Sequence, residues 1–280
     1  MAKYRLLREA LSTSDNFWFE PAPLATADQI ALVHDEQYIS DFLLGSLDPR
    51  ITRRIGFPWS EHLVKRTLAS VGGTLKAAGD ALEDGWGGTL AGGTHHAFQA
   101  EGSGFCVFND IAIAIRSLRL NRVSVVDLDV HQGDGTAKIF ADDPSVFTLS
   151  LHGRDNFPFR KQVSRWDVPL PDGTTDDVYL QALRSALPHA FEFRPSAVIY
   201  QSGVDGLASD RLGRLSLSHD GLRQRDELVF SACKEAGIPC VVTLGGGYSD
   251  PISLTVEAHR NTFETAARIL GSATRSRPGC

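Results

Sequence analysis

The chain has 280 residues, of which 28 are lysine or arginine and 34 are aspartate or glutamate, so its formal net charge is −6. Hydrophobic residues make up 42% and charged residues 22% of the sequence, which excludes disordered, collagen-like and coiled-coil proteins. The acidic balance argues against direct nucleic-acid binding, which needs a surplus of lysine and arginine. No apolar run approaches the roughly 20 residues of a membrane-spanning helix.

The N-terminal segment MAKYRLLREAL predicts a short amphipathic helix, because Arg5, Arg8 and Glu9 interrupt its apolar positions and exclude a secretory signal. Apolar residues at helical spacing predict further helices over 61–84 and 107–119. The four cysteines form no Cys-x-x-Cys pair and are expected to be free thiols in a reducing cytoplasm.

Four short runs rich in β-branched residues follow, at 122–130, 145–152, 196–203 and 238–247. They are almost continuously apolar, which indicates strands buried on both faces of a parallel sheet. Helical segments at 176–193, 218–236 and 252–270 alternate with them. This alternation predicts an α/β protein with a doubly wound, mostly parallel sheet, forming a single domain over 1–280 with a flexible tail at about 271–280.

Polar residues cluster directly after these strands, where ligands bind in open parallel sheets. In extended chain, residues two apart face the same side, so Asp129 and His131 can point at one ion. Together with Asp205 they offer two carboxylates and one imidazole, a set of three ligands that suits a catalytic zinc ion. In the alternative interpretation, Asp129 caps the next helix and Asp205 closes a turn.

A second group of polar residues suits proton transfer. His95 and His96 are adjacent in a glycine-rich loop, and an imidazole is well matched to general acid–base catalysis near neutral pH. Asp127 and Asp134 are spare carboxylates that can orient the two rings. Tyr248 follows three glycines and either packs on that turn or donates a hydrogen bond to an oxyanion opposite the metal.

These residues lie in motifs that resemble the zinc-dependent histone deacetylases and their bacterial relatives. The motifs are GGTHHAFQAEGSGFCVFNDIAIAI, VSVVDLDVHQGDGTAKIF, VFTLSLH, SGVDGLASDRLGRLSLS and LGGGY, in the order seen in that family. The resemblance runs from about Lys3 to about residue 270. His-Gln-Gly at 131–133, where most classes have His-His-Gly, together with SDRLGRLSLS and RDELVF at 225–230, is similar to class IV histone deacetylases.

The resemblance implies a three-layer arginase/deacetylase fold and the roles already described for the Asp–His–Asp set, the histidine pair and Tyr248. It further implies that Gly104 and Phe105 line a narrow tunnel for an acyl-lysine chain. A potassium ion is implied close behind the zinc, near Asp127, Ser150 and Leu151, with further oxygens from Asp129 and His131.

The implied activity is removal of an acyl group from lysine in a protein or peptide by a cytoplasmic, zinc-dependent amidohydrolase. A deacetylase of small acylated amines, such as acetylpolyamines, is the main alternative and differs only at the entrance. A two-metal ureohydrolase is disfavoured, because no second carboxylate stands two residues after Asp205. A non-catalytic scaffold is disfavoured because no ligand is missing. Acyl chain length and oligomeric state stay open.

Two departures from the family pattern set further expectations. The chain starts inside the usual N-terminal pattern, so a strand at the sheet edge is expected to be missing or the start to be set late. Residues 49–61 are expected to form a loop, containing proline and aromatic residues, that shapes the rim of the site.

Overall fold

A computed structural model describes residues 2–271 and contains a six-stranded sheet with the strand order β1-β6-β5-β2-β3-β4. The strands are β1 (Trp86–Gly88), β2 (Val123–Asp127), β3 (Val146–Gly153), β4 (Trp166–Leu170), β5 (Ala197–Gln201) and β6 (Cys240–Thr243). Each neighbouring pair is parallel. The predicted α/β fold is confirmed, and within the described residues the sheet is parallel throughout.

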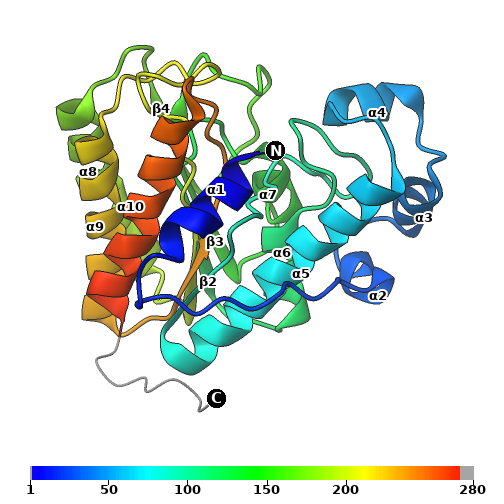
Figure 1. Cartoon of the computed structure of the whole chain (residues 1–280), viewed down its shortest axis with the longest axis horizontal. Coiled ribbons are helices and arrows are strands. Elements are labelled where there is room, and N and C mark those ends of the chain that lie inside the picture. The colour runs from blue at the N-terminus through cyan, green and yellow to red at the C-terminus, as the bar shows by residue number, and fades with distance from the viewer. Residues whose placement is uncertain (1, 272–280) are drawn as a thin grey trace.

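Helices cover both faces of this sheet (Figure 1). They are α1 (Ala2–Leu11), α2 (Ala27–Ala31), α3 (Glu36–Leu44), α4 (Pro49–Ile55), α5 (Glu61–Asp84), α6 (Asp110–Ser117), α7 (Asp134–Ile139), α8 (Asp176–Glu192), α9 (His219–Ala236) and α10 (Ile252–Leu270). Alternate strand residues point to opposite faces, so Val125 and Ile199 pack with α5 and α6, whereas Val126 and Tyr200 pack with α1 and α8 to α10. Two cores flank one sheet, which gives the expected three layers.

The long predicted helices are present because their ends carry strong capping residues. Ser60 accepts a hydrogen bond from the Leu63 amide at the start of α5, and Gly85 ends that helix at a φ of 91°. The helix predicted over 107–119 is shorter than expected, because the Asn109 side chain caps α6 and the helix begins only at Asp110.

Two sequence-based expectations need correction, one for residues 49–61 and one for the strands at the edges of the sheet. Residues 49–61 are not a loop throughout: Asp48 caps α4, Pro49 occupies its first turn, and only the part after Gly56 is irregular. The short apolar run at 89–91 indicates a strand end before Gly92, but the strand itself, β1, lies at Trp86–Gly88, and β4 is not predicted; both are short and lie at the two edges of the sheet.

The ends of the chain bear on three other expectations. The predicted N-terminal helix is α1, and it packs against α10 (Figure 1). Among the described residues no strand precedes β1. The predicted flexible tail lies, apart from Gly271, outside the described residues. No described helix is both long and apolar enough to cross a membrane.

Candidate active site

The loops that follow four adjacent strands meet at one edge of the sheet. Asp127 ends β2 and pairs in register with Ser150 of β3 and Gln201 of β5. The loop after β1 is tied to the loop after β6, because the Gly245 amide donates to the Gly92 carbonyl over 3.3 Å. The predicted site residues on these loops are therefore brought together by the sheet order.

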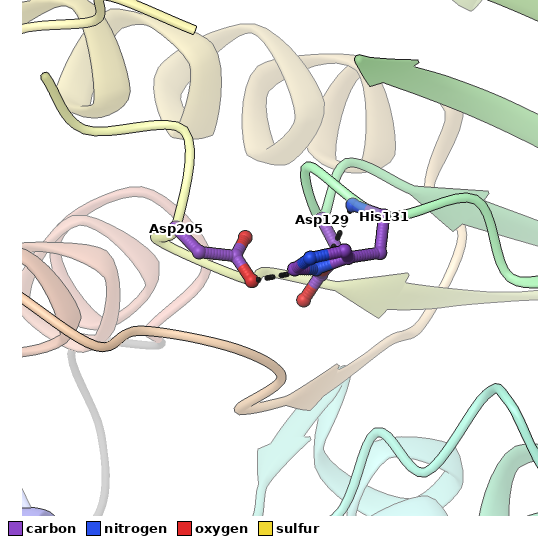
Figure 2. A group of neighbouring side chains, drawn as sticks. All are labelled: Asp129, His131 and Asp205. Atoms are coloured by element: carbon purple, nitrogen blue, oxygen red, sulfur yellow. Dashed lines mark hydrogen bonds and ion pairs between the residues drawn. The ribbon is translucent and has the colours of Figure 1, made fainter. Parts of the chain in front are cut away.

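Asp129, His131 and Asp205 form a compact buried group (Figure 2). One potential ligand atom from each residue lies within 4.8 Å of the others. His131 Nδ1 is 3.0 Å from Asp129 Oδ1 and 3.1 Å from Asp205 Oδ2. The other carboxylate oxygens accept backbone hydrogen bonds, Asp129 Oδ2 from Gly246 and Asp205 Oδ1 from Val130. These bonds aim the two carboxylates at the imidazole.

The electrostatics of this group suit a cation. Burial raises the pKa of Asp205, the nearby charge of Asp129 raises it further, and the value reaches about 6. Burial alone would lower the pKa of His131, but its hydrogen bonds to Asp129 and Asp205 outweigh that effect and raise the pKa to about 10. The two carboxylates thus stabilise positive charge where they converge, so the donor set fits a divalent ion such as zinc. Asp129 does not cap α7, whose N-cap is Gly133.

Each member of the histidine pair is oriented by one of the predicted carboxylates. His95 Nδ1 is 2.7 Å from Asp127 Oδ2, and His96 Nδ1 is 2.6 Å from Asp134 Oδ1. The ring centroids of the two histidines are 4.2 Å apart. Because each ring shares its Nδ1 proton with a carboxylate, the Nε2 atoms are left for chemistry.

The two imidazoles differ in their proton affinity. Burial opposes protonation of His95, but the charge and hydrogen bond of Asp127 outweigh it and raise its pKa to about 9. Burial and the charge of His95 lower the pKa of His96 to about 4, against the opposing effect of Asp134. His96 is therefore the neutral partner near pH 7 and can accept a proton, whereas His95 holds one.

Tyr248 stands on a turn that only glycine can form. A Cβ atom at Gly246 would lie 1.8 Å from Asp205 Oδ2, and Gly245 has a φ of 69°. The Tyr248 amide donates to Asp210 Oδ2 over 2.6 Å, which anchors the end of the turn. Burial and the charges of Asp205 and Asp129 raise the pKa of Tyr248 well above its ordinary value, so the phenol keeps its proton.

Gly104 lies beside His96, next to an aromatic residue that sequence reasoning missed, whereas Phe105 lies near Tyr248. Phe157 has its ring centroid 5.0 Å from that of His96. A Cβ atom at Gly104 would lie 2.6 Å from His96 Cδ2 and 3.1 Å from Phe157 Cε1, so a side chain there would fill the space between them. The signal that could have found Phe157 is the aromatic pair in NFPF, in the loop that follows β3.

The end of α4 and the segment after it contact Gly104 and Phe105, and a role for residues 49–61 in shaping the rim of the site stays a prediction. The amides of Gly104 and Phe105 donate to the carbonyls of Arg54 and Ile55 over 3.1 and 2.9 Å. The rings of Phe57 and Phe105 are 5.2 Å apart, and Phe105 is 6.0 Å from Tyr248. Phe105 is 43% exposed, so the aromatic wall reaches the surface.

Two further polar residues near the site had no role assigned from the sequence, although Gln132 belongs to the His-Gln-Gly motif. Gln132 Nε2 donates to the Gln162 carbonyl, and its Oε1 accepts from the Gln162 amide, each over 2.8 Å. These two hydrogen bonds to the backbone of Gln162 hold the loop that carries Phe157.

Lys3 of α1 is buried. Its ammonium group donates to the Gly245 carbonyl over 3.1 Å and lies 5.1 Å from the centre of the Tyr248 ring. The potassium ion expected near Asp127, Ser150 and Leu151 stays a prediction.

A model of the histone deacetylase domain matches residues 1–263. The chain is a member of the histone deacetylase family. It is 38% identical over 254 residues to histone deacetylase 2 of Arabidopsis thaliana, covering 84% of this chain and 65% of that protein. It is 32% identical over 275 residues to the acetoin utilization protein AcuC of Bacillus subtilis, covering 88% and 70%. An uncharacterized protein of Picosynechococcus sp. is 48% identical over 244 residues, covering 85% and 81%.

The fold of this histone deacetylase family member is shared by a solved structure. The crystal structure of an acetylpolyamine aminohydrolase from Burkholderia pseudomallei has a TM-score of 0.80 at 21% identity and covers 95% of this chain and 90% of that one. Family membership shows that the protein is a deacetylase, a hydrolase acting on amide bonds. The class IV assignment stays a prediction.

Proposed function

We propose that this protein is a zinc-dependent deacylase that hydrolyses the amide of acylated lysine in proteins or peptides. The observation that carries the proposal is a buried Asp–His–Asp group beside an oppositely tuned histidine pair, with the ring centroids of His96 and His131 5.9 Å apart. Asp129, His131 and Asp205 would hold the ion. When bound, zinc supplies Lewis-acid polarisation of the acyl carbonyl and lowers the pKa of a water molecule.

The side chains supply the proton transfers. His96, neutral and hydrogen-bonded through Nδ1 to Asp134, accepts the proton of the attacking water at Nε2. Tyr248 donates its hydroxyl proton in a hydrogen bond to the oxyanion that develops on the acyl oxygen. The C–N bond then breaks as His96 returns the proton to the departing amine. The products are a carboxylate and an ammonium ion, since the amine takes up the proton that the carboxylic acid releases, and Asp127 keeps His95 charged beside the base throughout.

The entrance favours an acyl-lysine peptide over a polyamine. Gly104 and Phe157 flank His96, and the ring of Phe105 lies 6.0 Å from that of Tyr248, so we expect an extended alkyl chain to approach the site between these aromatic side chains. Phe159, which is 83% exposed, adds apolar surface to the same loop. Lys161, two residues further along this loop, donates to the Asn156 and Pro158 carbonyls over 2.5 and 2.6 Å, and we expect its charge to disfavour a polycationic amine. We further expect a cytoplasmic location, since the described cysteines are free thiols.

Turnover by the zinc-loaded protein tests the proposal. We expect acetyl- and myristoyl-lysine peptides to be cleaved at least about 10-fold more efficiently than an acetylpolyamine. His96→Ala should lower kcat by about 10²- to 10⁴-fold, the usual contribution of a general base, with zinc content unchanged. His62→Ala, on the exposed face of α5, is the matched control. Faster cleavage of the polyamine would contradict the substrate assignment, and wild-type turnover by His96→Ala would contradict the proton-transfer role.

A further inference from the structure

The largest fully buried side chain of the described residues is a charged one, Arg225 of α9. It belongs to the RDELVF segment, to which the proposed function assigns no role. Arg225 and its neighbour Asp226 are each only 1% exposed. Burying a guanidinium is costly unless every donor finds a partner, so its contacts show what it is held for.

One side of the guanidinium is neutralised by Asp226. Arg225 Nε donates to Asp226 Oδ1 over 2.9 Å, and Nη2 lies 2.8 Å from the same oxygen. Asp226 is itself fixed, because it accepts hydrogen bonds from the hydroxyls of Tyr200 on β5 and Thr262 on α10. The ion pair is thus a rigid element wedged between the sheet and two helices.

The other side of the guanidinium faces the strand ends that lead to the proposed metal ligands. Arg225 Nη1 donates to the Gly203 carbonyl over 2.6 Å and to the Leu128 carbonyl over 3.3 Å, and Nη2 donates to the Ser202 carbonyl over 3.4 Å. Leu128 directly precedes Asp129, and Gly203 stands two residues before Asp205.

The hydrogen bonds of Arg225 lie just beyond the point where β2 and β5 stop pairing. Register pairing between β2 and β5 ends at Asp127 and Gln201, and the Leu128 amide makes one more bond, to the Gln201 carbonyl over 3.0 Å. Beyond that point the two segments separate to form the site. Arg225 bridges them where the ladder has stopped, using the fork of donors that only arginine presents.

We infer that Arg225 is a positioning residue for the metal site, holding the segment that carries Asp129 and His131 at a set distance from the segment that carries Asp205. The inference rests on the proposed function for the identity of the ligand group. Its guanidinium contacts the backbone of both segments and acts through them on the ligand carboxylates.

Metal affinity of suitable variants tests this role directly. Arg225→Met together with Asp226→Asn removes the buried charge pair without leaving an unpaired charge, and the amide still serves Tyr200 and Thr262. We expect the dissociation constant for Zn²⁺, measured by competition with a chromophoric chelator, to rise by about 10- to 100-fold, as for other residues that orient metal ligands. The visible spectrum of the Co²⁺-loaded protein should change as well, because the ligand geometry is relaxed.

Two single variants frame the result. Arg225→Lys keeps the charge opposite Asp226 but cannot bond both strand ends at once, so its affinity should fall between wild type and the double variant. Arg223→Met, two residues away on the exposed side of α9, should leave zinc affinity unchanged. A purely structural role for Arg225 would lower the melting temperature and leave the zinc affinity and cobalt spectrum of the folded protein as in wild type.

The outcomes separate this inference from the proposed function. If wild type and Asp205→Ala bind zinc equally, the proposed metal site itself is wrong. If wild type binds zinc and Asp205→Ala does not, but the folded double variant matches wild type in affinity and spectrum, the role of Arg225 is overturned. Should the double variant not fold, wild-type zinc affinity in Arg225→Lys overturns it instead.

Discussion

His34 is held neutral in the core by two backbone groups. Its Nδ1 lies 3.2 Å from the Gln99 carbonyl, and its Nε2 accepts the Asn109 amide over 2.9 Å. This pattern requires the proton on Nδ1 and leaves no acceptor for a second proton at Nε2. Burial accordingly lowers the pKa of His34 to about 4, against the opposing hydrogen bond to Gln99. Neutral His34 therefore joins the segment before α3 to the N-cap residue of α6, and protonation would break this link.

Stability should depend on pH through His34. The folded pKa lies below the unfolded value of about 6.5, so the unfolded chain binds more protons between pH 4 and 6.5, and stability falls as the pH drops through that window. The free energy of unfolding of wild type and of His34→Gln is measured by urea titration at pH 7 and at pH 5. We expect the difference between the two proteins to shrink by about 2 kcal/mol from pH 7 to pH 5. A constant difference between the two proteins would contradict this protonation model.

At the scale of elements, α1 joins the core and the site. Leu7 and Leu11 are each 1% exposed and belong to the core that includes α8 to α10. The opposite side of the helix carries the exposed Arg5–Glu9 pair. Lys3, at its start, reaches the turn before Tyr248. An element at the very start of the chain is thus packed as firmly as an internal helix.

Truncation of Leu7 measures this packing. Leu7→Ala should lower the free energy of unfolding by about 2–5 kcal/mol, because a large buried side chain is lost and a cavity is left. Glu9→Ala, which removes only an exposed ion pair, should change it by less than about 1 kcal/mol. Denaturant titration of both variants provides the measurement, and equal, small effects would show that α1 contributes little to the folded state.

At the scale of the whole molecule, the proposed metal site couples chemistry to stability. The carboxylates that converge on His131 come from the ends of β2 and β5, so their mutual repulsion acts on the centre of the sheet. A divalent cation that binds the folded chain alone would relieve this repulsion and shift the folding equilibrium by mass action.

Zinc should therefore raise the melting temperature. At a free zinc concentration about 100-fold above the dissociation constant, binding adds about 2.7 kcal/mol, which corresponds to a rise of about 5 °C or more. Asp205→Ala should lose the zinc-dependent part of the shift. Differential scanning fluorimetry with and without a chelator checks both expectations, and an equal shift in Asp205→Ala would place the stabilising zinc elsewhere.

Local patterns in the sequence were sufficient for much of the fold. The buried strands β2, β5 and β6 are continuous apolar runs, and α5 and α9 have clear periodicity with caps at both ends. Short elements were missed, because β1 is only Trp-Gly-Gly and α4 carries three exposed or half-buried arginines in seven residues. Such segments are defined by what they pair with, not by their own pattern.

The sequence by itself determined which polar residues end the strands, and hence the composition of the site, because parallel strands bring their carboxyl ends to one edge. Only the tertiary structure decided which histidine is neutral, since burial and the charge of His95 act through space. It also decided that Phe157 flanks His96, that Lys3 reaches Gly245, and that Arg225 joins Leu128 to Gly203. These contacts link residues far apart in the chain, and their geometry exists only once the sheet order has brought the loops together.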